Sequence, residues 1–191
     1  MAFLYIEKQF PDLRLILRTA WPPQIEGADI TKVVREHPKI TLLPDKLSDD
    51  EILDLLIRAD IFFLDAASVH SVSILRAMYC GAACVVSDAP GYEEYATHGE
   101  SAIVIPGRRA AVYSEDPETG WLRSDFKPML QMSEQRLGLV AGALQALCTN
   151  RETRLTFGAN ARRRVMERNS FAGWKDGFEA VMRGALEAPP A

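Results

Sequence analysis

The stretch Ile61-Phe62-Phe63-Leu64 is apolar at every position, and a second largely apolar run, Cys84-Val85-Val86-Ser87, follows further along the chain. A run that is apolar throughout is typical of a strand covered on both faces, as in a parallel sheet. Between the two runs, Val72 to Cys80 is predicted to form a helix, and Gly81 would cap its C-terminal end. A strand, a helix and a second strand in this order predict a βαβ unit.

The same alternation extends to both sides of this unit. Ser48 and Glu51 have the spacing of a capping box and predict the start of a further helix. More strands are expected at residues 13–17, 40–43 and 102–105, and C-terminal helices at 133–148, 151–168 and 170–186. The sequence therefore predicts an α/β fold with a doubly wound parallel sheet and appended C-terminal helices.

We expect residues 1–191 to form a single domain in three parts. The parts are an α/β core over residues 1–105, a long loop over 106–128 and the helical region over 129–187. Loops as long as the middle part are uncommon in compact domains and are usually functional or mobile. Trp121 lies in this loop, and we leave open whether its side chain anchors the loop to the core or stacks on a sugar.

The composition excludes several classes of protein. The chain has 22 Lys and Arg against 26 Asp and Glu, a net charge of −4, so we expect no nucleic-acid partner. No apolar run approaches the roughly 18 residues that cross a bilayer. The first residues do not resemble a signal peptide, and the three cysteines form no metal-binding or disulfide pattern. We therefore predict a cytoplasmic protein with reduced thiols, no metal site and no cofactor.

The common nucleotide and hydrolase fingerprints are missing from the sequence. It has no GxGxxG after a strand, no GxxxxGK[ST] and no GxSxG. In an open α/β sheet, ligands bind outside the carboxyl ends of the strands. Polar residues are concentrated in the two loops expected at that edge. Those of the first loop are Asp65, Ser68, His70, Ser71 and Ser73, and those of the second are Ser87, Asp88, Gly91, Glu93 and Glu94.

Three segments in this order resemble one known family. They are Asp60-Ile61-Phe62-Phe63-Leu64, Ile74-Leu75-Arg76-Ala77-Met78-Tyr79-Cys80-Gly81 and Val85-Val86-Ser87-Asp88-Ala89-Pro90-Gly91-Tyr92-Glu93-Glu94. Together they are similar to the C-terminal, donor-binding domain of retaining glycosyltransferases with the GT-B fold (group 1, or family 4-like). The resemblance implies a Rossmann-like half of a two-domain enzyme that takes a sugar from a nucleotide diphosphate sugar. The acceptor would be held by a separate N-terminal domain or partner chain.

The resemblance also implies a set of donor-binding residues. On the positions of this sequence they are Asp65, Ser68, His70, Ser71, Arg76, Ser87, Asp88, Gly91 and Glu94. Gly91, Glu94 and Gly99 fit the family pattern. Ser68 and Arg76, however, stand where the family has two glutamates, one on the donor sugar and one on the ribose hydroxyls. A guanidinium only donates hydrogen bonds, so Arg76 cannot accept from a ribose diol, although it could bind a phosphate.

Three functions remain open at this point, and one of them is a phosphosugar-handling enzyme built on the same kind of sheet. The first is a donor-binding domain of a hexosyl-transfer type of glycosyltransferase, incomplete for catalysis on its own and with unknown catalytic residues. The second is a degenerate, non-catalytic domain of the same fold that binds a ligand or a partner. Each basic residue also has a structural interpretation. Arg76 could pair with a nearby acid, and Arg162-Arg163-Arg164 could form a solvated helix face or a peripheral contact with an anionic membrane.

Overall fold

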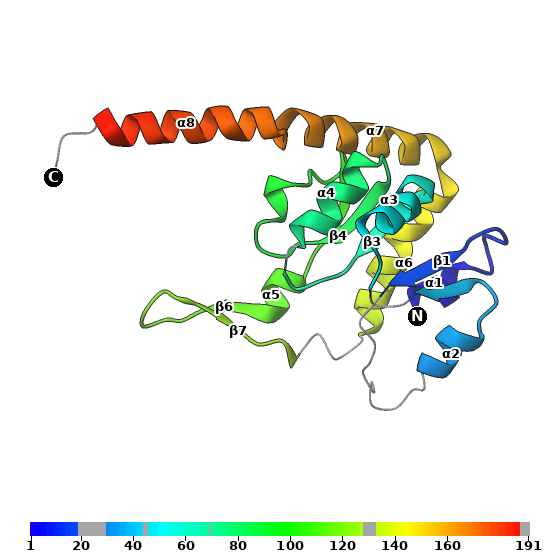
Figure 1. The fold of residues 1–191 in the computed structure, drawn as a ribbon. Helices are drawn as coiled ribbons and strands as arrows, with labels where there is room; N and C mark the ends of the chain where they lie inside the picture. Colours follow the sequence, from blue (N-terminus) through cyan, green and yellow to red (C-terminus); the bar gives the residue numbers. More distant parts are fainter. Residues whose placement is uncertain (19–29, 44–45, 69, 128–132, 188–191) are drawn as a thin grey trace.

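The first five strands form two parallel sheets, as the sequence predicts. The computed structural model describes residues 1–18, 30–43, 46–68, 70–127 and 133–187 (Figure 1). Strands β1 (Leu15–Arg18) and β2 (Ile40–Leu43) pair in parallel, with Leu15 opposite Ile40. The second sheet has the order β3-β4-β5, formed by Ile61–Leu64, Ala83–Ser87 and Ala102–Ile105, and is also parallel.

Strand β4 lies at the centre of the three-stranded sheet and is buried along its whole length. Its side chains alternate between two apolar clusters, so both faces of the sheet are covered. Cys84 and Val86 pack with helix α4 (Ser71–Tyr79) and helix α7 (Arg151–Arg168). Val85 faces the other cluster, together with residues of helix α6 (Glu134–Thr149).

Further helices complete the described structure. They are α1 (Ala2–Ile6), α2 (Ile30–Glu36), α3 (Asp49–Arg58), the 3-10 turn η1 (Tyr92–Glu94), α5 (Arg108–Val112) and α8 (Phe171–Glu187). The capping box predicted for α3 is confirmed. The Glu51 amide donates to Ser48 Oγ at 3.3 Å, and the Ser48 amide donates to Glu51 Oε2 at 2.8 Å.

The structure differs from the long loop expected over residues 106–128. This segment contains α5 and an antiparallel hairpin of β6 (Tyr113–Glu115) and β7 (Leu122–Ser124), and its last residue lies outside the described residues. Buried Asp116 organises the turn by accepting hydrogen bonds from the amides of Glu118 and Thr119. Strands of three residues are too short to show an alternation of polar and apolar residues, which is why the pattern did not reveal them.

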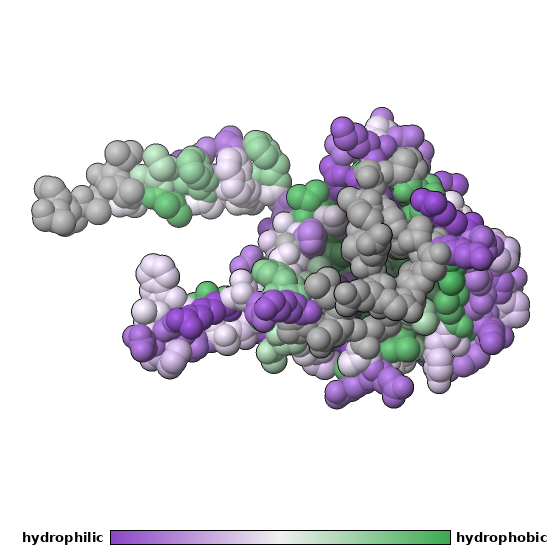
Figure 2. Space-filling model, turned by 90° about the horizontal axis from the view of Figure 1, so that it is seen from below, coloured by the Kyte–Doolittle hydropathy of each residue, from purple (hydrophilic) through white to green (hydrophobic). Residues whose placement is uncertain are grey.

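Two segments project from the same side of the body, the β6–β7 hairpin and helix α8 (Figures 1 and 2). Trp121 lies on the hairpin with 78% of its surface exposed, so it does not anchor the segment to the core. Its stacking on a sugar stays a prediction. The three predicted C-terminal helices are present as α6, α7 and α8, and residues 129–132 before them lie outside the described residues.

Candidate functional site

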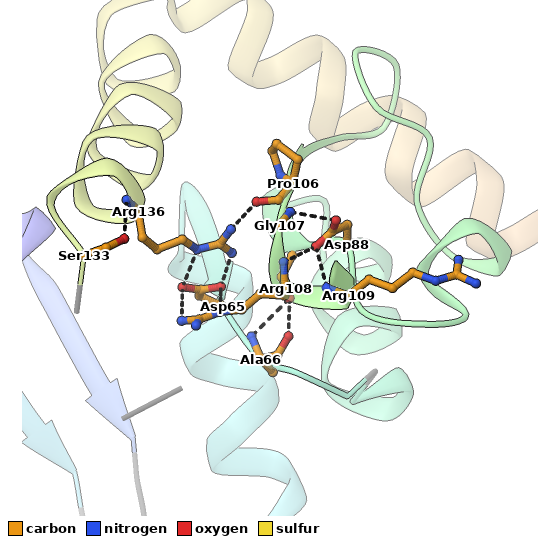
Figure 3. Close-up of polar contacts among 10 residues, drawn as sticks. Asp65, Ala66, Asp88, Pro106, Gly107, Arg108, Arg109, Ser133 and Arg136 are labelled. Atoms are coloured by element: carbon orange, nitrogen blue, oxygen red, sulfur yellow. Dashed lines mark hydrogen bonds and ion pairs between the residues drawn. The ribbon is translucent and has the colours of Figure 1, made fainter. Parts of the chain in front are cut away.

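The carboxyl ends of β3, β4 and β5 bring together residues from four separate parts of the chain (Figure 3). Asp65 directly follows β3, and Asp88 follows β4. Two arginines that the sequence analysis did not single out complete the group: Arg108, at the start of α5, and Arg136, in the first turn of α6. We call Asp65, Asp88, Arg108 and Arg136 the edge cluster.

Asp65 is held by both arginines of the edge cluster. Arg108 donates through Nε to Asp65 Oδ1 at 2.9 Å and through Nη2 to Oδ2 at 2.7 Å. Arg136 donates through Nε to Oδ2 at 3.2 Å and through Nη2 to Oδ1, and its Nη1 reaches the carbonyl of Pro106. The three side chains are only 13–14% exposed. The carboxylate thus accepts two bidentate pairs, an arrangement that strongly fixes its position.

The two guanidinium groups determine the ionisation of Asp65. Burial by itself raises the pKa of this carboxyl group. Hydrogen bonds and positive charge from Arg136 and Arg108 outweigh that effect, so the pKa of Asp65 lies below its ordinary value. Asp65 is therefore ionised near neutral pH. With two arginines and two aspartates, the edge cluster as a whole carries no net formal charge.

Asp88 caps the backbone of the segment that follows β5. Its carboxylate accepts from the amides of Gly107 and Arg108, both at 2.7 Å, and from that of Arg109 at 3.2 Å. Gly107 adopts φ 103°, a left-handed conformation that favours glycine. Asp88 therefore orients Arg108 toward Asp65, so its observed role is to build the cluster.

Ser87 also bonds within the protein. Its hydroxyl accepts from the amide of Ala66 at 3.2 Å and donates to the carbonyl of the same residue. This contact links the end of β4 to the loop after β3. The structure thus brings together Asp65, Ser87 and Asp88 as predicted, but all three use their polar atoms on internal hydrogen bonds.

Among the described residues, we find no hydrogen bond between this group and the remaining predicted donor residues. Ser68 and His70 are exposed, and Ser71 is the first residue of α4. Gly91 has φ 88° and leads into η1, where Glu94 is exposed. These positions leave Ser68, His70 and Glu94 accessible, and their contact with a donor remains a prediction.

Arg76 is paired with a nearby acid, which is the structural role that the sequence analysis gave as the alternative to phosphate binding. Its Nη1 forms an ion pair with Asp49 Oδ1 at 2.9 Å, which joins α4 to the first turn of α3. About a third of the Arg76 side chain is exposed. A phosphate ligand at this position would have to compete with Asp49.

The basic run on α7 divides into three different environments. Arg164 donates through Nη2 to the carbonyls of Glu93 and Glu94 at 3.0 and 3.2 Å, so it fixes the turn that carries Glu94. Arg162 lies over the ring of Tyr79, 5.6 Å from its centroid. Arg163 is exposed, as a solvated face requires. Arg162 and Arg163 are both exposed, so the predicted solvated face is confirmed for these two residues and is wrong only for Arg164, while membrane contact through this run stays a proposal.

Two cavities of the described structure are lined by no residue of the edge cluster. One, of about 290 Å³, is at the opposite edge of the sheet and is lined by residues that include Leu13, Asp60 and Arg154. The other, of about 460 Å³, runs along α6 beside Tyr5. Neither is lined by any of the nine predicted donor residues. Within the described ranges we find no group of His, Cys, Asp or Glu side chains suited to a metal ion, and no helix long and apolar enough to span a bilayer.

Comparison with known proteins agrees with this architecture. The C-terminal domain of a glycosyl transferase group 1 family protein from Francisella tularensis superposes with a TM-score of 0.63 at 15% identity, over 89% of this chain and 76% of that one. Sucrose-phosphate synthase from Thermosynechococcus elongatus gives 0.64 at 17% identity, over 98% of this chain and 42% of that one. A chain of a GtfA/B complex gives 0.56 at 14%, over 94% and 32%. At these identities the similarity establishes the fold alone. The chain spans less than half of the length of the sucrose-phosphate synthase and of the GtfA/B chain.

Sequence comparison supplies the family. No curated protein gives a significant match. The sequence profile of the family described as "Glycosyl transferases group 1" matches residues 2–116, more than half of the chain and all of β1 to β5. The chain therefore belongs to the group 1 glycosyl transferases and has the fold of their C-terminal domain.

Proposed function

We propose that this domain binds the diphosphate of a nucleotide-activated sugar at the edge cluster, for transfer of the sugar to an acceptor held by another domain or chain. The observation that carries the proposal is the convergence of Arg108 and Arg136 on Asp65, where parallel strands end. Arginine recognises phosphate oxygens with the same bidentate geometry that it uses for a carboxylate. A diphosphate could therefore displace the Asp65 carboxylate from one of the two guanidinium groups and bind that group in its place.

The chemistry of such a domain consists of positioning and charge stabilisation. A bound diphosphate develops negative charge as the sugar leaves, and fixed cationic donors stabilise that charge. The acceptor side and the remaining catalytic groups would come from the partner. Structural relatives that are more than twice as long as this chain support a partner domain. A cytoplasmic location, where nucleotide sugars would be available, is part of the same proposal.

A specific observation favours a second function, a non-catalytic domain of the same fold. Arg76 is paired with Asp49, and the resemblance implies that Ser68 and Arg76 stand where the family has two glutamates. Asp65 and Asp88 are also fully engaged with protein donors. In this alternative the edge cluster is a structural lock, and the domain holds a partner without binding a donor.

Calorimetry distinguishes the two functions. UDP, ADP, GDP and their glucose conjugates are titrated into the full chain at concentrations up to the millimolar range. We expect binding of at least one diphosphate, weakened about 10- to 100-fold by Arg136→Ala, because each charge-assisted bidentate contact contributes on the order of 1.5–3 kcal/mol. Arg163→Ala, on the exposed face of α7, is the matched control and should bind as the wild type does. Circular dichroism checks that Arg136→Ala remains folded.

Each outcome selects one function. If no diphosphate binds at millimolar concentration, the donor-binding proposal is wrong and the non-catalytic alternative holds. Arg76→Ala separately tests whether that arginine contacts phosphate, since its removal should weaken binding only if Asp49 releases it. We expect no sugar transfer by this chain alone. Measurable transfer would contradict both the non-catalytic alternative and the need for a partner.

A further inference from the structure

The β6–β7 hairpin carries an exposed aromatic side chain at its far end. Its base is fixed at the edge cluster, because the Asp88 carboxylate binds the amides that lead into α5, and α5 runs directly into β6. Figure 1 shows the hairpin extending away from α5, with the turn of residues 116–121 as its most distant part. Trp121 ends this turn and is one of the most exposed large side chains of the described structure.

The turn that carries Trp121 is braced from within. The Asp116 carboxylate accepts hydrogen bonds from two backbone amides of the turn, each at 2.9 Å, and forms an ion pair with Arg123. Two backbone bonds of 2.8 Å close the turn, one from the Gly120 amide to the carbonyl of Asp116 and one from the Asp116 amide to the carbonyl of Trp121. Trp121 is therefore held in place before any ligand binds, which lowers the entropic cost of binding.

The register of the hairpin decides which side chains surround Trp121. Ser114 lies opposite Arg123, and the antiparallel bonding continues to Asp116 and Trp121. Because side chains alternate along a strand, Trp121 and Arg123 share one face, whereas Leu122 points to the other. We call the face with Ser114, Asp116, Trp121 and Arg123 the Trp121 face. It offers an aromatic ring beside a hydroxyl group and a guanidinium group whose side chain is 70% exposed.

A pyranose ring matches this combination of groups. One side of such a ring presents C–H groups, and their slight positive charge is attracted by the negative face of an aromatic ring. The sugar hydroxyl groups surround the ring, where they accept hydrogen bonds from a guanidinium group and donate to a hydroxyl or carboxylate oxygen. An apolar protein or lipid surface would match the indole alone and would strip water from Arg123 without replacing its hydrogen bonds, which is costly. The chemistry of the Trp121 face therefore favours a carbohydrate.

We propose that the Trp121 face binds one sugar ring of a carbohydrate chain, with Trp121 as the stacking surface and Arg123 as a hydrogen-bond donor. The turn lies far out along the hairpin from α5 (Figure 1), so this ring is not the sugar attached to a diphosphate at the edge cluster. It is a further unit of an acceptor whose reacting end is held elsewhere. The assignment to the acceptor rests on the proposed function, whereas the binding of a sugar by the hairpin does not.

NMR titration of the full chain tests this binding at the proposed site. The probes are maltohexaose, isomaltohexaose, cellohexaose and β-1,4-mannohexaose, and the readout is the indole N–H signals of the three tryptophans. Trp121→Phe identifies the signal of Trp121. We expect at least one hexasaccharide to shift that signal, with a dissociation constant of about 0.1–5 mM, as is reasonable for one stacked ring with few hydrogen bonds. The signal of Trp174 should stay unchanged.

Variants of exposed residues separate stacking from a general effect on the fold. Trp121→Ala should weaken binding at least about tenfold, as is usual for a tryptophan at the centre of a contact. Trp121→Phe keeps an aromatic face and should bind within a few-fold of the wild type. Leu122→Ala, on the opposite face of the same hairpin, and Trp174→Ala, on α8, are the matched controls and should bind normally. Because all three side chains are exposed, the variants should unfold at the wild-type temperature.

The outcomes also separate this inference from the proposed function. The inference is overturned if no hexasaccharide shifts the Trp121 signal at about 20 mM, a concentration that would detect even millimolar binding. It is equally overturned if Trp121→Ala leaves binding intact or if Leu122→Ala abolishes it. The titrations are repeated with UDP, ADP and GDP in place of the sugars. Sugar binding without nucleotide binding would support the hairpin site and contradict the donor site, and the reverse result would do the opposite.

Discussion

Replacement of Gly158 by alanine is expected to lower the free energy of unfolding by about 1–3 kcal/mol, the usual cost of an added methyl group in a packed interior. Gly158 is buried in α7 where that helix crosses the turn after α4. A β-carbon at this position would overlap the carbonyl oxygen of Gly81 and lie 3.0 Å from its carbonyl carbon. Both atoms belong to the backbone, so they cannot move aside as the end of a side chain would.

The turn that meets Gly158 has little freedom to adjust. Gly81 adopts φ 82° as the cap that the sequence predicted, and Ala82 donates back to the carbonyl of Ala77. Beyond this turn β4 begins, in the fully buried centre of the sheet. A methyl group on α7 would thus displace either the helix or the start of the central strand.

A matched variant separates this steric effect from helix propensity. Gly142→Ala, in exposed surroundings on α6 with open space around the added carbon, should stabilise the protein by about 0.5–1 kcal/mol. Urea or thermal unfolding of both variants at neutral pH gives the comparison, with roughly 2–4 °C of Tm expected per kcal/mol. A gain in stability for both variants would contradict the close contact between α7 and the turn.

The parallel α/β fold was predictable because its signals are local. Residues 61–64 and 84–87 are apolar enough to indicate buried strands, and the Ser48–Glu51 spacing predicted a cap that the hydrogen bonds confirm. The hairpin was not predictable, because its strands have three residues each and its turn depends on the side chain of Asp116.

The edge cluster was only half predictable, for a different reason. Asp65 and Asp88 follow apolar strands, so their place at the carboxyl edge could be inferred from the order of elements. Arg108 also follows a strand and could have been selected by the same rule. Arg136 is 71 residues from Asp65, so no local pattern of the sequence connects the two. Contacts of this kind depend on how helices pack against the sheet.

Asp65→Asn is expected to destabilise the protein by about 2–3 kcal/mol. This cost is smaller than that of breaking a fully buried ion pair, because the three side chains remain slightly exposed. An amide lacks the negative charge that offsets Arg108 and Arg136, and its NH₂ group would face their donors. The control is Asp49→Asn, which removes an exposed ion pair with Arg76 and should cost less than about 1 kcal/mol. Similar small losses in both variants would contradict a tightly bonded edge cluster in solution.

The pH dependence of the free energy of unfolding tests the same contact independently. Because the pKa of Asp65 is lowered in the folded protein, its contribution to stability is fully present above the ordinary carboxyl pKa of about 4 and is lost as the pH falls through the lowered value. Urea unfolding at pH 7 and at pH 3 should therefore show a larger acid-induced loss for the wild type than for Asp65→Asn. With Asp65→Asn in place, Arg136→Met should cost less than it does in the wild type, because it also relieves the repulsion between two unneutralised guanidinium groups. Equal costs in the two backgrounds would mean that Arg136 stabilises the domain through the Pro106 carbonyl and its own packing, independently of Asp65.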